Sequence, residues 1–318
     1  MAQFPASVPR KHALFASLHR RALRLHDCLV CLPKHRRIDE RNAPVLHQKI
    51  RGQSGFGIMP FQEQNGLRYY QFDIFPKTVL NAVVTRRGGT SPAPWHSLNL
   101  GGSVGDDPFR VAANRVRVFE TLGRAPASIH DVWLVHGTDI VYADAPRPLE
   151  QPAHKADIIF TDNPEVSLFM RFADCVPLLF HDPKQNVIGI AHAGWMGTVK
   201  GVAEAALNGM RERYNSKPED VVVGIGPSIG VDHYEVGADV ISQYREKYGK
   251  EADAVIQSRN GSLHLDLWTA NAIQLKNAGV EQIQVSGICT ACYLDDWFSH
   301  RAEKGKTGRF GALMALAG

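Results

Sequence analysis

The sequence predicts an α/β protein of the α+β type, in which mixed β-sheets are flanked by helices. Three observations lead to this class: short β-branched runs bounded by turn residues are frequent, longer helical patterns are few, and the two do not alternate strictly. A doubly wound parallel sheet would require strict alternation of strands and helices, so that fold is excluded.

Organised sequence begins near Met59, and residues 69–75 soon after it carry the aromatic pattern of a strand. Further β-branched runs predict strands at 79–85, 131–135, 139–143, 166–171, 177–182, 187–191, 220–225 and 282–286. Longer segments with apolar residues at helical spacing predict helices at 108–123, 197–214, 238–248 and 267–278. No repeat and no linker divides residues 59–318, so we expect one domain there.

Residues 1–58 differ from the rest of the chain in charge and pattern. They carry eleven Lys/Arg against three Asp/Glu, a formal charge of +8, whereas the remaining 260 residues sum to −4. Five histidines are interspersed among them, and no helical or strand pattern is sustained. We therefore expect a basic, disordered extension. A translation-start artefact, a dispensable tail and an organelle transit peptide stay open as its origin.

The composition excludes several classes of protein. With 318 residues, 44% hydrophobic and 21% charged, the chain can bury a core, so a disordered or fibrous protein is excluded. No apolar run approaches the roughly 18 residues that a membrane-spanning helix needs. Five cysteines, an odd number, do not form a secreted disulfide scaffold, and no signal-peptide pattern precedes them. We expect a cytoplasmic protein with no membrane or nucleic-acid partner, because the basic excess is confined to one segment.

Two glycine-containing motifs do not predict a nucleotide site. The segment 224–230 follows a predicted strand, but its spacing is GxGxxxG, and Pro227 lacks the backbone donor that a pyrophosphate requires. The GKT sequence at 305–307 lacks the first glycine of a P-loop, because His300 stands in its place.

The cysteine and histidine patterns argue against two other metal sites. The CxxC pairs Cys28/Cys31 and Cys289/Cys292 together have the ligand count of a structural zinc site. Because 258 residues separate the pairs and one lies in the extension, we interpret the match as coincidence. A blue-copper oxidase holds several copper ions with many histidines, commonly in HxH pairs, and this chain has no HxH.

Three short segments each place a metal ligand at a predicted strand end. They contain His136 in VHGT, Cys175 in ADCVP and His192 in AHAGW. Spacings of 39 and 17 residues are too long for a zinc finger but suit ligands brought together by adjacent strands. Two imidazoles and a thiolate form a tetrahedral zinc site with one open position, at which the metal lowers the pKa of water to about 7.

Spacing alone leaves two other interpretations open. Each of these side chains is also compatible with a packed or hydrogen-bonded residue at a strand end. Alternatively, Cys175 is a nucleophile with His192 or His136 as its base, an arrangement that uses the same residues without a metal.

Several motifs, in this order along the chain, closely resemble the YfiH family: VHG, ADCVPLLF, AHAGW followed by GTVKG, GPSIG followed by HYEVG, CTAC, FSHR and KTGR. The resemblance also includes residues 85–91, 97–101 and 104–108, and it covers about residues 68–316. The family was first called polyphenol oxidase or laccase-domain proteins and was later assigned as purine nucleoside phosphorylases with adenosine deaminase activity. The resemblance implies a compact α/β sandwich with mixed sheets.

By this resemblance, His136, Cys175 and His192 match the family's zinc ligands. The implied reactions are phosphorolysis of adenosine, inosine and methylthioadenosine, and hydrolytic deamination of adenosine, so purine nucleosides and phosphate are the implied partners. Cu²⁺ is a second candidate for the same site, since divalent copper outcompetes zinc for nitrogen and sulfur ligands. Phenol oxidation is then expected as a side activity of copper-loaded protein.

Further residues are candidates within this chemistry. Asp174, next to the thiolate ligand, is our candidate for moving protons during deamination. Arginine suits the phosphate of phosphorolysis, because its fork of donors matches phosphate oxygens. Arg87, beside two glycines, is the first choice for this contact, and Arg301 and Arg309 are second choices. Asn99, in the SLNLG motif, is a further substrate-binding candidate.

The chain departs from the family pattern at two places. Met196 follows AHAGW, where the family usually has arginine. If that arginine contacts phosphate, its loss removes about 1.5–3 kcal/mol, which makes phosphorolysis the more vulnerable activity. The paired cysteines common after GPxIG are Asp232 and His233 here, so these positions are not obligatory ligands, and His233 is a candidate for contact with substrate.

Two functions of other classes stay open beside the nucleoside enzyme. One, also implied by the family, is an amidohydrolase-like role in editing peptidoglycan precursors, with Cys175 as nucleophile. The other is a non-catalytic binding module in which the zinc is structural.

Overall fold

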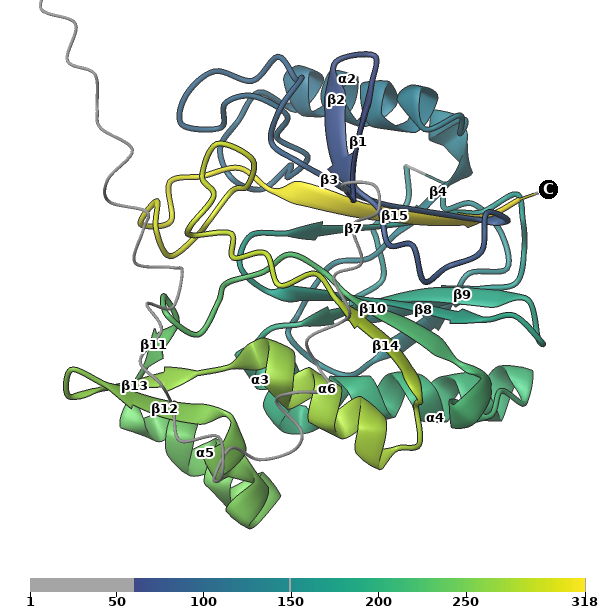
Figure 1. The fold of residues 1–318 in the computed structure, drawn as a ribbon. Helices are drawn as coiled ribbons and strands as arrows, with labels where there is room; N and C mark the ends of the chain where they lie inside the picture. The colour runs from purple at the N-terminus through teal and green to yellow at the C-terminus, as the bar shows by residue number, and fades with distance from the viewer. Residues whose placement is uncertain (1–59, 149, 318) are drawn as a thin grey trace, which may run out of the picture. The chain divides into compact units, whose positions relative to one another are not determined.

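A computed structural model describes residues 60–148 and 150–317 (Figure 1). The predicted basic extension, 1–58, lies outside these residues, and so do Cys28 and Cys31. Among the described residues, every helix is too short or too polar to cross a membrane.

A first sheet has the strand order β1-β2-β3-β15-β7-β4. Its strands are β1 (Phe61–Gln64), β2 (Leu67–Tyr70), β3 (Val79–Val84), β15 (Phe310–Leu316), β7 (Ser167–Phe172) and β4 (Ile129–Asp131). β15 pairs antiparallel with both β3 and β7, whereas β4 pairs parallel with β7. The last strand of the chain therefore lies in the middle of a mixed sheet.

A second sheet has the order β14-β10-β8-β9-β6-β5. Its strands are β14 (Gln282–Val285), β10 (Val222–Ile225), β8 (Val176–Asp182), β9 (Val187–Ala193), β6 (Ile158–Thr161) and β5 (Ile140–Tyr142). The inner pairs are antiparallel, and the outer pairs β10–β14 and β5–β6 are parallel. A small third sheet contains β11 (Glu235–Val236), β13 (Ser262–Leu265) and β12 (Ile256–Arg259).

Helices cover the outer faces of the two large sheets (Figure 1). α2 (Pro108–Thr121) lies on the first sheet, and α3 (Trp195–Lys200), α4 (Val202–Tyr214) and α6 (Leu267–Asn277) lie on the second. α5 (Ala238–Tyr248) packs beside the small sheet. Short 3₁₀ turns are η1 (Pro126–Ser128), η2 (Pro218–Asp220) and η3 (Gly249–Ala254). This arrangement confirms the predicted α+β class with mixed sheets and flanking helices.

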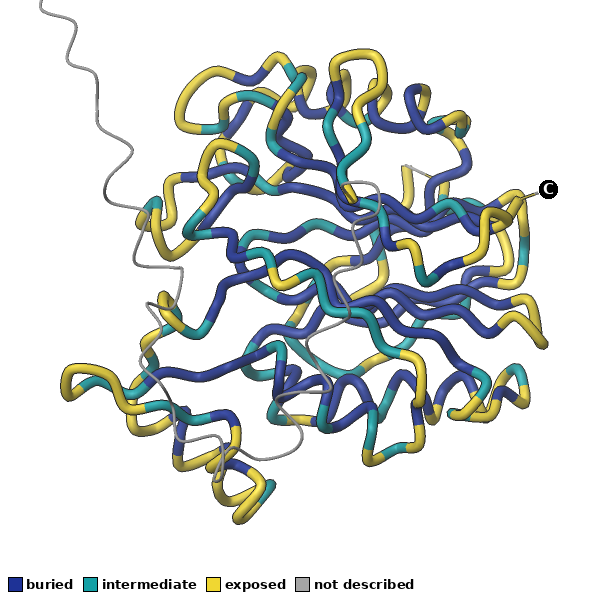
Figure 2. The backbone as a smooth tube through the Cα atoms, viewed as in Figure 1, coloured by how far each residue is buried: buried dark blue, intermediate teal, exposed yellow. Residues whose placement is uncertain are grey.

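The core is layered because the central strands bury both of their faces (Figure 2). On β15, Phe310, Ala312 and Met314 belong to the apolar cluster between the two sheets. Leu313, which points to the opposite face, packs with Phe119 of α2. A strand buried on both faces has a nearly continuous apolar sequence, which explains why β15 lacks the alternation that predicts a strand.

The predicted helix 197–214 is two helices in the structure. α3 ends and α4 begins at Gly201, which has a φ of 86°. A left-handed residue cannot continue a right-handed helix, and glycine adopts this conformation without steric cost. The single-helix prediction was therefore wrong at the one glycine that reverses the backbone.

The predicted strand 131–135 is also wrong for most of its length. β4 ends at Asp131, and Trp133 makes only an isolated bridge with Lys155. Beyond it, the backbone N–H groups of Val135 and His136 donate to the buried side chain of Asp157. The Asp157 carboxylate accepts the hydrogen bonds that the carbonyls of a neighbouring strand would otherwise accept. The segment therefore forms a loop.

Candidate metal centre

The three predicted ligands come together at one end of the second sheet. His136 lies in the loop between β4 and β5, Cys175 directly precedes β8, and His192 is on β9. One ligand atom of each lies within 4.8 Å of the other two. In the register of β8 and β9, Val176 lies opposite Ala193, which brings Cys175 beside the end of β9.

The backbone at this end of the sheet allows the candidate ligands to lie close together. His136 has a φ of 58° and Asp174 a φ of 84°, so both turn the chain in the left-handed region. A Cβ on Gly194 would lie 2.9 Å from the Cys175 sulfur and 3.1 Å from Cδ2 of His136. Glycine is therefore the residue that lets the two ligands approach β9.

Asp157, which the sequence analysis did not identify, connects two of the ligands. Its carboxylate is fully buried and accepts the backbone N–H groups of Val135, His136 and Gly137 at 3.1, 3.0 and 2.7 Å. Its Oδ1 also lies 2.9 Å from Nδ1 of His192. The carboxylate thus fixes the imidazole ring and leaves its Nε2 for the metal. The only sequence signal is an acidic residue at the start of an apolar run.

The thiol and the imidazole form a charged pair. Burial by itself would raise the pKa of Cys175, but the positive charge of His192 and hydrogen bonds from His136 and His192 lower that pKa to about 6. Burial opposes protonation of His192, while Cys175 and Asp157 raise its pKa to about 9. Near neutral pH the sulfur is therefore a thiolate, the form that binds a metal or acts as a nucleophile.

The donor set fits zinc. Two imidazoles and a thiolate match its preference for nitrogen and sulfur, and a carboxylate behind a ligating histidine is usual at such sites. Among residues 60–148 and 150–317, no fourth His, Cys, Asp or Glu joins the group. One coordination position is left for a non-protein ligand. Divalent copper is compatible with the same three atoms.

Both carboxylate oxygens of Asp174 are occupied by donors from the C-terminal segment. Oδ1 accepts from the Thr290 hydroxyl and Oδ2 from the backbone N–H of Arg301, each at 2.7 Å. The side chain is 7% exposed. Asp174 therefore ties Thr290 and Arg301 to the turn that carries Cys175.

Two side chains of this region interact electrostatically with Cys175 and with Asp174 before it. Burial lowers the pKa of Arg309, opposed by Cys175 and Asp174. Burial also raises the pKa of Tyr234, and Cys175 raises it further. The guanidinium of Arg301 lies 5.1 Å above the Tyr234 ring and donates to the carbonyl of Glu235. Tyr234 was not identified from the sequence as a site residue.

Asn99 supports Arg309 from inside the protein. It is fully buried, and its Oδ1 accepts the backbone N–H of Arg309 at 2.9 Å. Its amide nitrogen donates to Gly101 and Asp106. These bonds use both ends of the amide, so the structure places Asn99 as a support for the backbone of Arg309.

Arg87 lies in a different place from the three ligands. A cavity of about 430 Å³ is lined by Arg86, Arg87, Gly88, His96, Ser97, Leu294 and Asp295, and none of the three predicted ligands lines it. Nε of Arg87 pairs with Asp296 at 2.6 Å. A phosphate at Arg87 would compete with this carboxylate.

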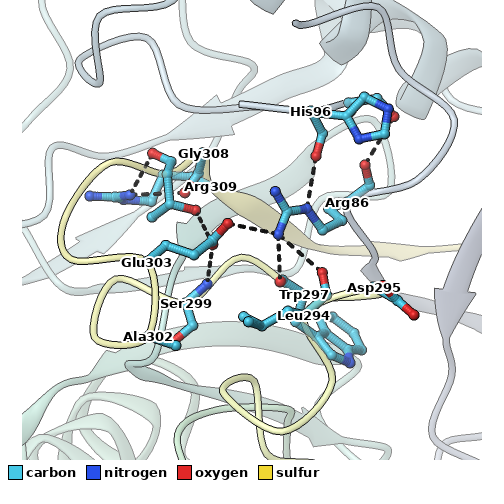
Figure 3. Close-up of polar contacts among 12 residues, drawn as sticks. Arg86, His96, Leu294, Asp295, Trp297, Ser299, Ala302, Glu303, Gly308 and Arg309 are labelled. Carbon is cyan, nitrogen blue, oxygen red and sulfur yellow. Dashed lines mark hydrogen bonds and ion pairs between the residues drawn. The ribbon is translucent and has the colours of Figure 1, made fainter. Parts of the chain in front are cut away.

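Arg86, the residue before Arg87, makes contacts that hold the segment carrying Arg301 and Arg309 (Figure 3). Its guanidinium donates to the carbonyls of His96, Leu294 and Trp297 and pairs with Glu303 at 3.0 Å. The other oxygen of Glu303 accepts the backbone N–H of Ser299. One partly buried cation thus joins the C-terminal segment to the loop that follows β3.

Comparison with known proteins gives the family. Residues 80–317 match the family described as multi-copper polyphenol oxidoreductase laccase. The chain belongs to this family. Several of its members carry a different name: a protein of Deinococcus radiodurans, 40% identical over 75% of this chain and 89% of its own length, is named purine nucleoside phosphorylase. Purine nucleoside phosphorylase YfiH of Escherichia coli is 34% identical over 76% of this chain and 95% of its own length.

Solved structures of the laccase-like family share the fold. YlmD from Geobacillus stearothermophilus superposes with a TM-score of 0.77 at 34% identity, covering 81% of this chain and 99% of that chain. The Bacillus licheniformis hypothetical protein YfiH gives a TM-score of 0.75, also at 34% identity, over 81% of this chain and all of its own. The predicted resemblance to the YfiH family is confirmed.

Proposed function

We propose that this protein is a zinc-dependent purine nucleoside phosphorylase that also deaminates adenosine. The observation that carries the proposal is the convergence of His136, Cys175 and His192 on one point, with Asp157 orienting an imidazole and one coordination position open. The names of the relatives support the substrate class. Adenosine, inosine and methylthioadenosine are the proposed nucleosides.

We assign different roles in this activity to the residues around the candidate metal centre. A zinc ion held by His136, Cys175 and His192 would supply the hydroxide that deamination requires at neutral pH. Arg301 and Arg309, which lie beside Asp174 and Tyr234, are better placed than Arg87 to hold an anion near the metal. Because its oxygens are occupied, we assign Asp174 to positioning the Arg301 segment rather than to proton transfer. The aromatic ring of Tyr234 offers a face on which a purine can stack.

Product analysis on adenosine tests this proposal. Zinc-loaded protein incubated without phosphate should give inosine alone. With phosphate it should also give adenine, and hypoxanthine from phosphorolysis of the inosine formed. His136→Ala should lose bound zinc and both products. A metal-free His136→Ala protein that keeps its turnover would contradict the proposal, and so would full zinc occupancy with no turnover on a nucleoside panel.

A second candidate is a metal-independent amide hydrolase, and one observation favours it. His192 hydrogen-bonds to Asp157 and lowers the pKa of Cys175, which is the order of a Cys–His–Asp nucleophilic triad. This arrangement would suit the editing of peptidoglycan precursors. Complete removal of metal separates the two candidates, since chelation abolishes zinc-dependent turnover but leaves a thiolate nucleophile active and open to alkylation.

Copper-dependent phenol oxidation is proposed only as a side activity. The family's name includes copper, and a His/Cys/His set accepts Cu²⁺. Copper-loaded protein should oxidise phenols slowly, while zinc-loaded protein should not. Oxidation that survives removal of copper would contradict this proposal.

A further inference from the structure

A second group of soft ligands lies apart from the three residues of the metal centre. Nδ1 of His233 is 3.7 Å from the Cys289 sulfur and 3.6 Å from the Cys292 sulfur, and all three atoms lie within 4.8 Å of one another. We propose that His233, Cys289 and Cys292 bind a second thiophilic metal ion, for which zinc is the first choice.

The distances match tetrahedral coordination. With Zn–S bonds near 2.3 Å and Zn–N bonds near 2.0 Å, a tetrahedral ion holds a sulfur and a nitrogen about 3.5 Å apart. The sulfur–nitrogen distances of 3.7 and 3.6 Å in the structure are close to this value. The side chains therefore need little rearrangement to enclose an ion, and two thiolates with one imidazole favour zinc or monovalent copper over magnesium or calcium.

Two loops are held together to form this group. Ser228 and Cys289 form an isolated parallel bridge, and Thr290 donates its backbone N–H to the carbonyl of Ser228 at 3.0 Å. Tyr293 then donates to the carbonyl of Cys289, a turn that returns Cys292 to the same side. His233 is placed by a second turn, in which its N–H bonds to Gly230.

Gly230 contributes a feature usual at metal–thiolate sites. Its backbone N–H points at the Cys289 sulfur, with the nitrogen 3.2 Å away. A Cβ at this position would lie 3.3 Å from the same sulfur, so glycine permits the approach. Hydrogen bonds to sulfur stabilise the thiolate over the thiol and tune metal binding.

The surroundings leave a path for the ion, and among the described residues no carboxylate belongs to this group. Cys289 is buried and Cys292 is partly buried, while His233 is exposed. Asp232, next to His233, forms an ion pair with Arg259 and is therefore engaged elsewhere. An exposed histidine above two sheltered sulfurs gives an ion access from solvent and leaves a fourth position for water or a small anion.

The second group is joined to the first by hydrogen bonds to Asp174. Thr290, between the two cysteines, donates to Asp174, which precedes Cys175. An ion at His233, Cys289 and Cys292 would therefore stiffen the same segment that Asp174 holds, although its binding does not depend on the proposed nucleoside activity.

Metal stoichiometry of the full chain tests the proposal. Reduced, metal-free protein carrying Cys28→Ser and Cys31→Ser, which removes the other CxxC pair, is loaded with Zn²⁺ and analysed after desalting. Two equivalents are expected. Adding Cys289→Ser and Cys292→Ser should leave one equivalent, and adding Cys175→Ser instead should remove the other.

Co²⁺ provides an independent spectroscopic readout. Thiolate-to-cobalt charge-transfer absorption should be stronger at the second site, which has two sulfurs, than at the first, which has one. His233→Ala changes an exposed side chain and should lower Co²⁺ affinity at the second site by about tenfold or more, with an unchanged circular dichroism spectrum. This variant keeps the test valid if the double serine variant fails to fold.

Three results would overturn the proposal. One equivalent of zinc both in the reduced unsubstituted chain and in the Cys28→Ser/Cys31→Ser protein would show that the second group holds no metal. An unchanged Co²⁺ affinity in His233→Ala would remove the histidine from the site. Loss of the second equivalent on changing Cys28 and Cys31 alone would assign the ion to a four-cysteine site instead.

Discussion

Asp157 is the residue whose burial and bonding explain most about the metal centre. One carboxylate receives three backbone donors from the loop of His136 and also orients His192. Burial works against its ionisation, but the bond to His192 and the donor of Gly137 hold the pKa of Asp157 below its usual value. The same group thus shapes a loop and fixes a ligand.

Replacing this carboxylate should damage both roles. In Asp157→Asn, one oxygen becomes an NH₂ group that faces backbone donors, so we expect zinc affinity to fall by about 10- to 100-fold. The free energy of unfolding should fall by about 1–3 kcal/mol, because a buried donor loses its acceptor. Zinc competition titration and thermal unfolding measure the two effects. The exposed Asp139→Asn is the matched control, and equal losses in both variants would contradict the assignment.

The pH dependence of metal affinity follows from the pair Cys175 and His192. With pKa values of about 6 and about 9, the metal-free pair holds one proton at neutral pH, on His192. A metal that takes both residues displaces this proton, so affinity should rise about tenfold per pH unit between these values. Below pH 6 the thiol is also protonated. The part of the pH dependence of metal affinity that comes from these two groups should then become steeper. Affinity that stays flat from pH 6.5 to 8.5 would contradict the charged pair.

Met196 is the residue-scale test of the phosphorylase activity. It lies in the first turn of α3, at the position where the family resemblance implies an arginine. Met196→Arg should raise phosphate-dependent turnover by about ten- to a hundredfold and leave phosphate-independent deamination unchanged, since a charge-assisted contact contributes about 1.5–3 kcal/mol. Met196→Leu is the control. An equal gain in both reactions would show that the position does not act on phosphate.

Among the elements, the antiparallel pair of β8 and β9 sets the spacing of the ligands. Their register puts Cys175 and His192 at the same end of the sheet, and Gly194 follows β9 against the sulfur. The loop after β4 supplies the third ligand because Asp157, which precedes β6, holds its backbone. The centre therefore depends on three segments whose positions are fixed by sheet pairing.

A methyl group at the end of β9 should disturb this spacing. In Gly194→Ala the new Cβ would lie 2.9 Å from the Cys175 sulfur, so sulfur and strand must separate. We expect zinc affinity to fall by about tenfold with a smaller loss of stability. Gly102→Ala, whose Cβ would have its nearest neighbour 4.0 Å away, is the control. Unchanged affinity in Gly194→Ala would show that the ligands are not held against this strand.

At the scale of the whole molecule, the family match does not include the basic segment 1–58. The match covers residues 80–317, and all ligands of both groups lie within that range. Deletion of residues 1–58 should leave zinc stoichiometry, thermal stability and adenosine turnover unchanged. Deletion of residues 1–78, which also removes β1 and β2, is expected to destabilise the first sheet. Loss of folded protein in the shorter deletion would contradict the predicted dispensable extension.

The sequence by itself determined the class of the fold and predicted three candidate ligands, which the structure brings together. Local patterns sufficed for elements such as α5, at 238–248, and β5, because periodicity and turn residues act within a few positions. His136, Cys175 and His192 were candidates because they stand at predicted strand ends, and the family resemblance selected the zinc interpretation over the two alternatives that spacing left open. The break at Gly201 was missed, since a glycine inside a helical pattern does not reveal the sign of its φ.

Only the tertiary structure decided which residues act together. The place of β15 between β3 and β7, and the donors gathered by Asp157, depend on pairings between residues far apart in the chain, which no local pattern encodes. The group of His233, Cys289 and Cys292 was hidden for the same reason, because its two loops meet through a bridge between Ser228 and Cys289. The chemical type of each residue is evident from the sequence, but only folding brings residues that are far apart in the chain into contact.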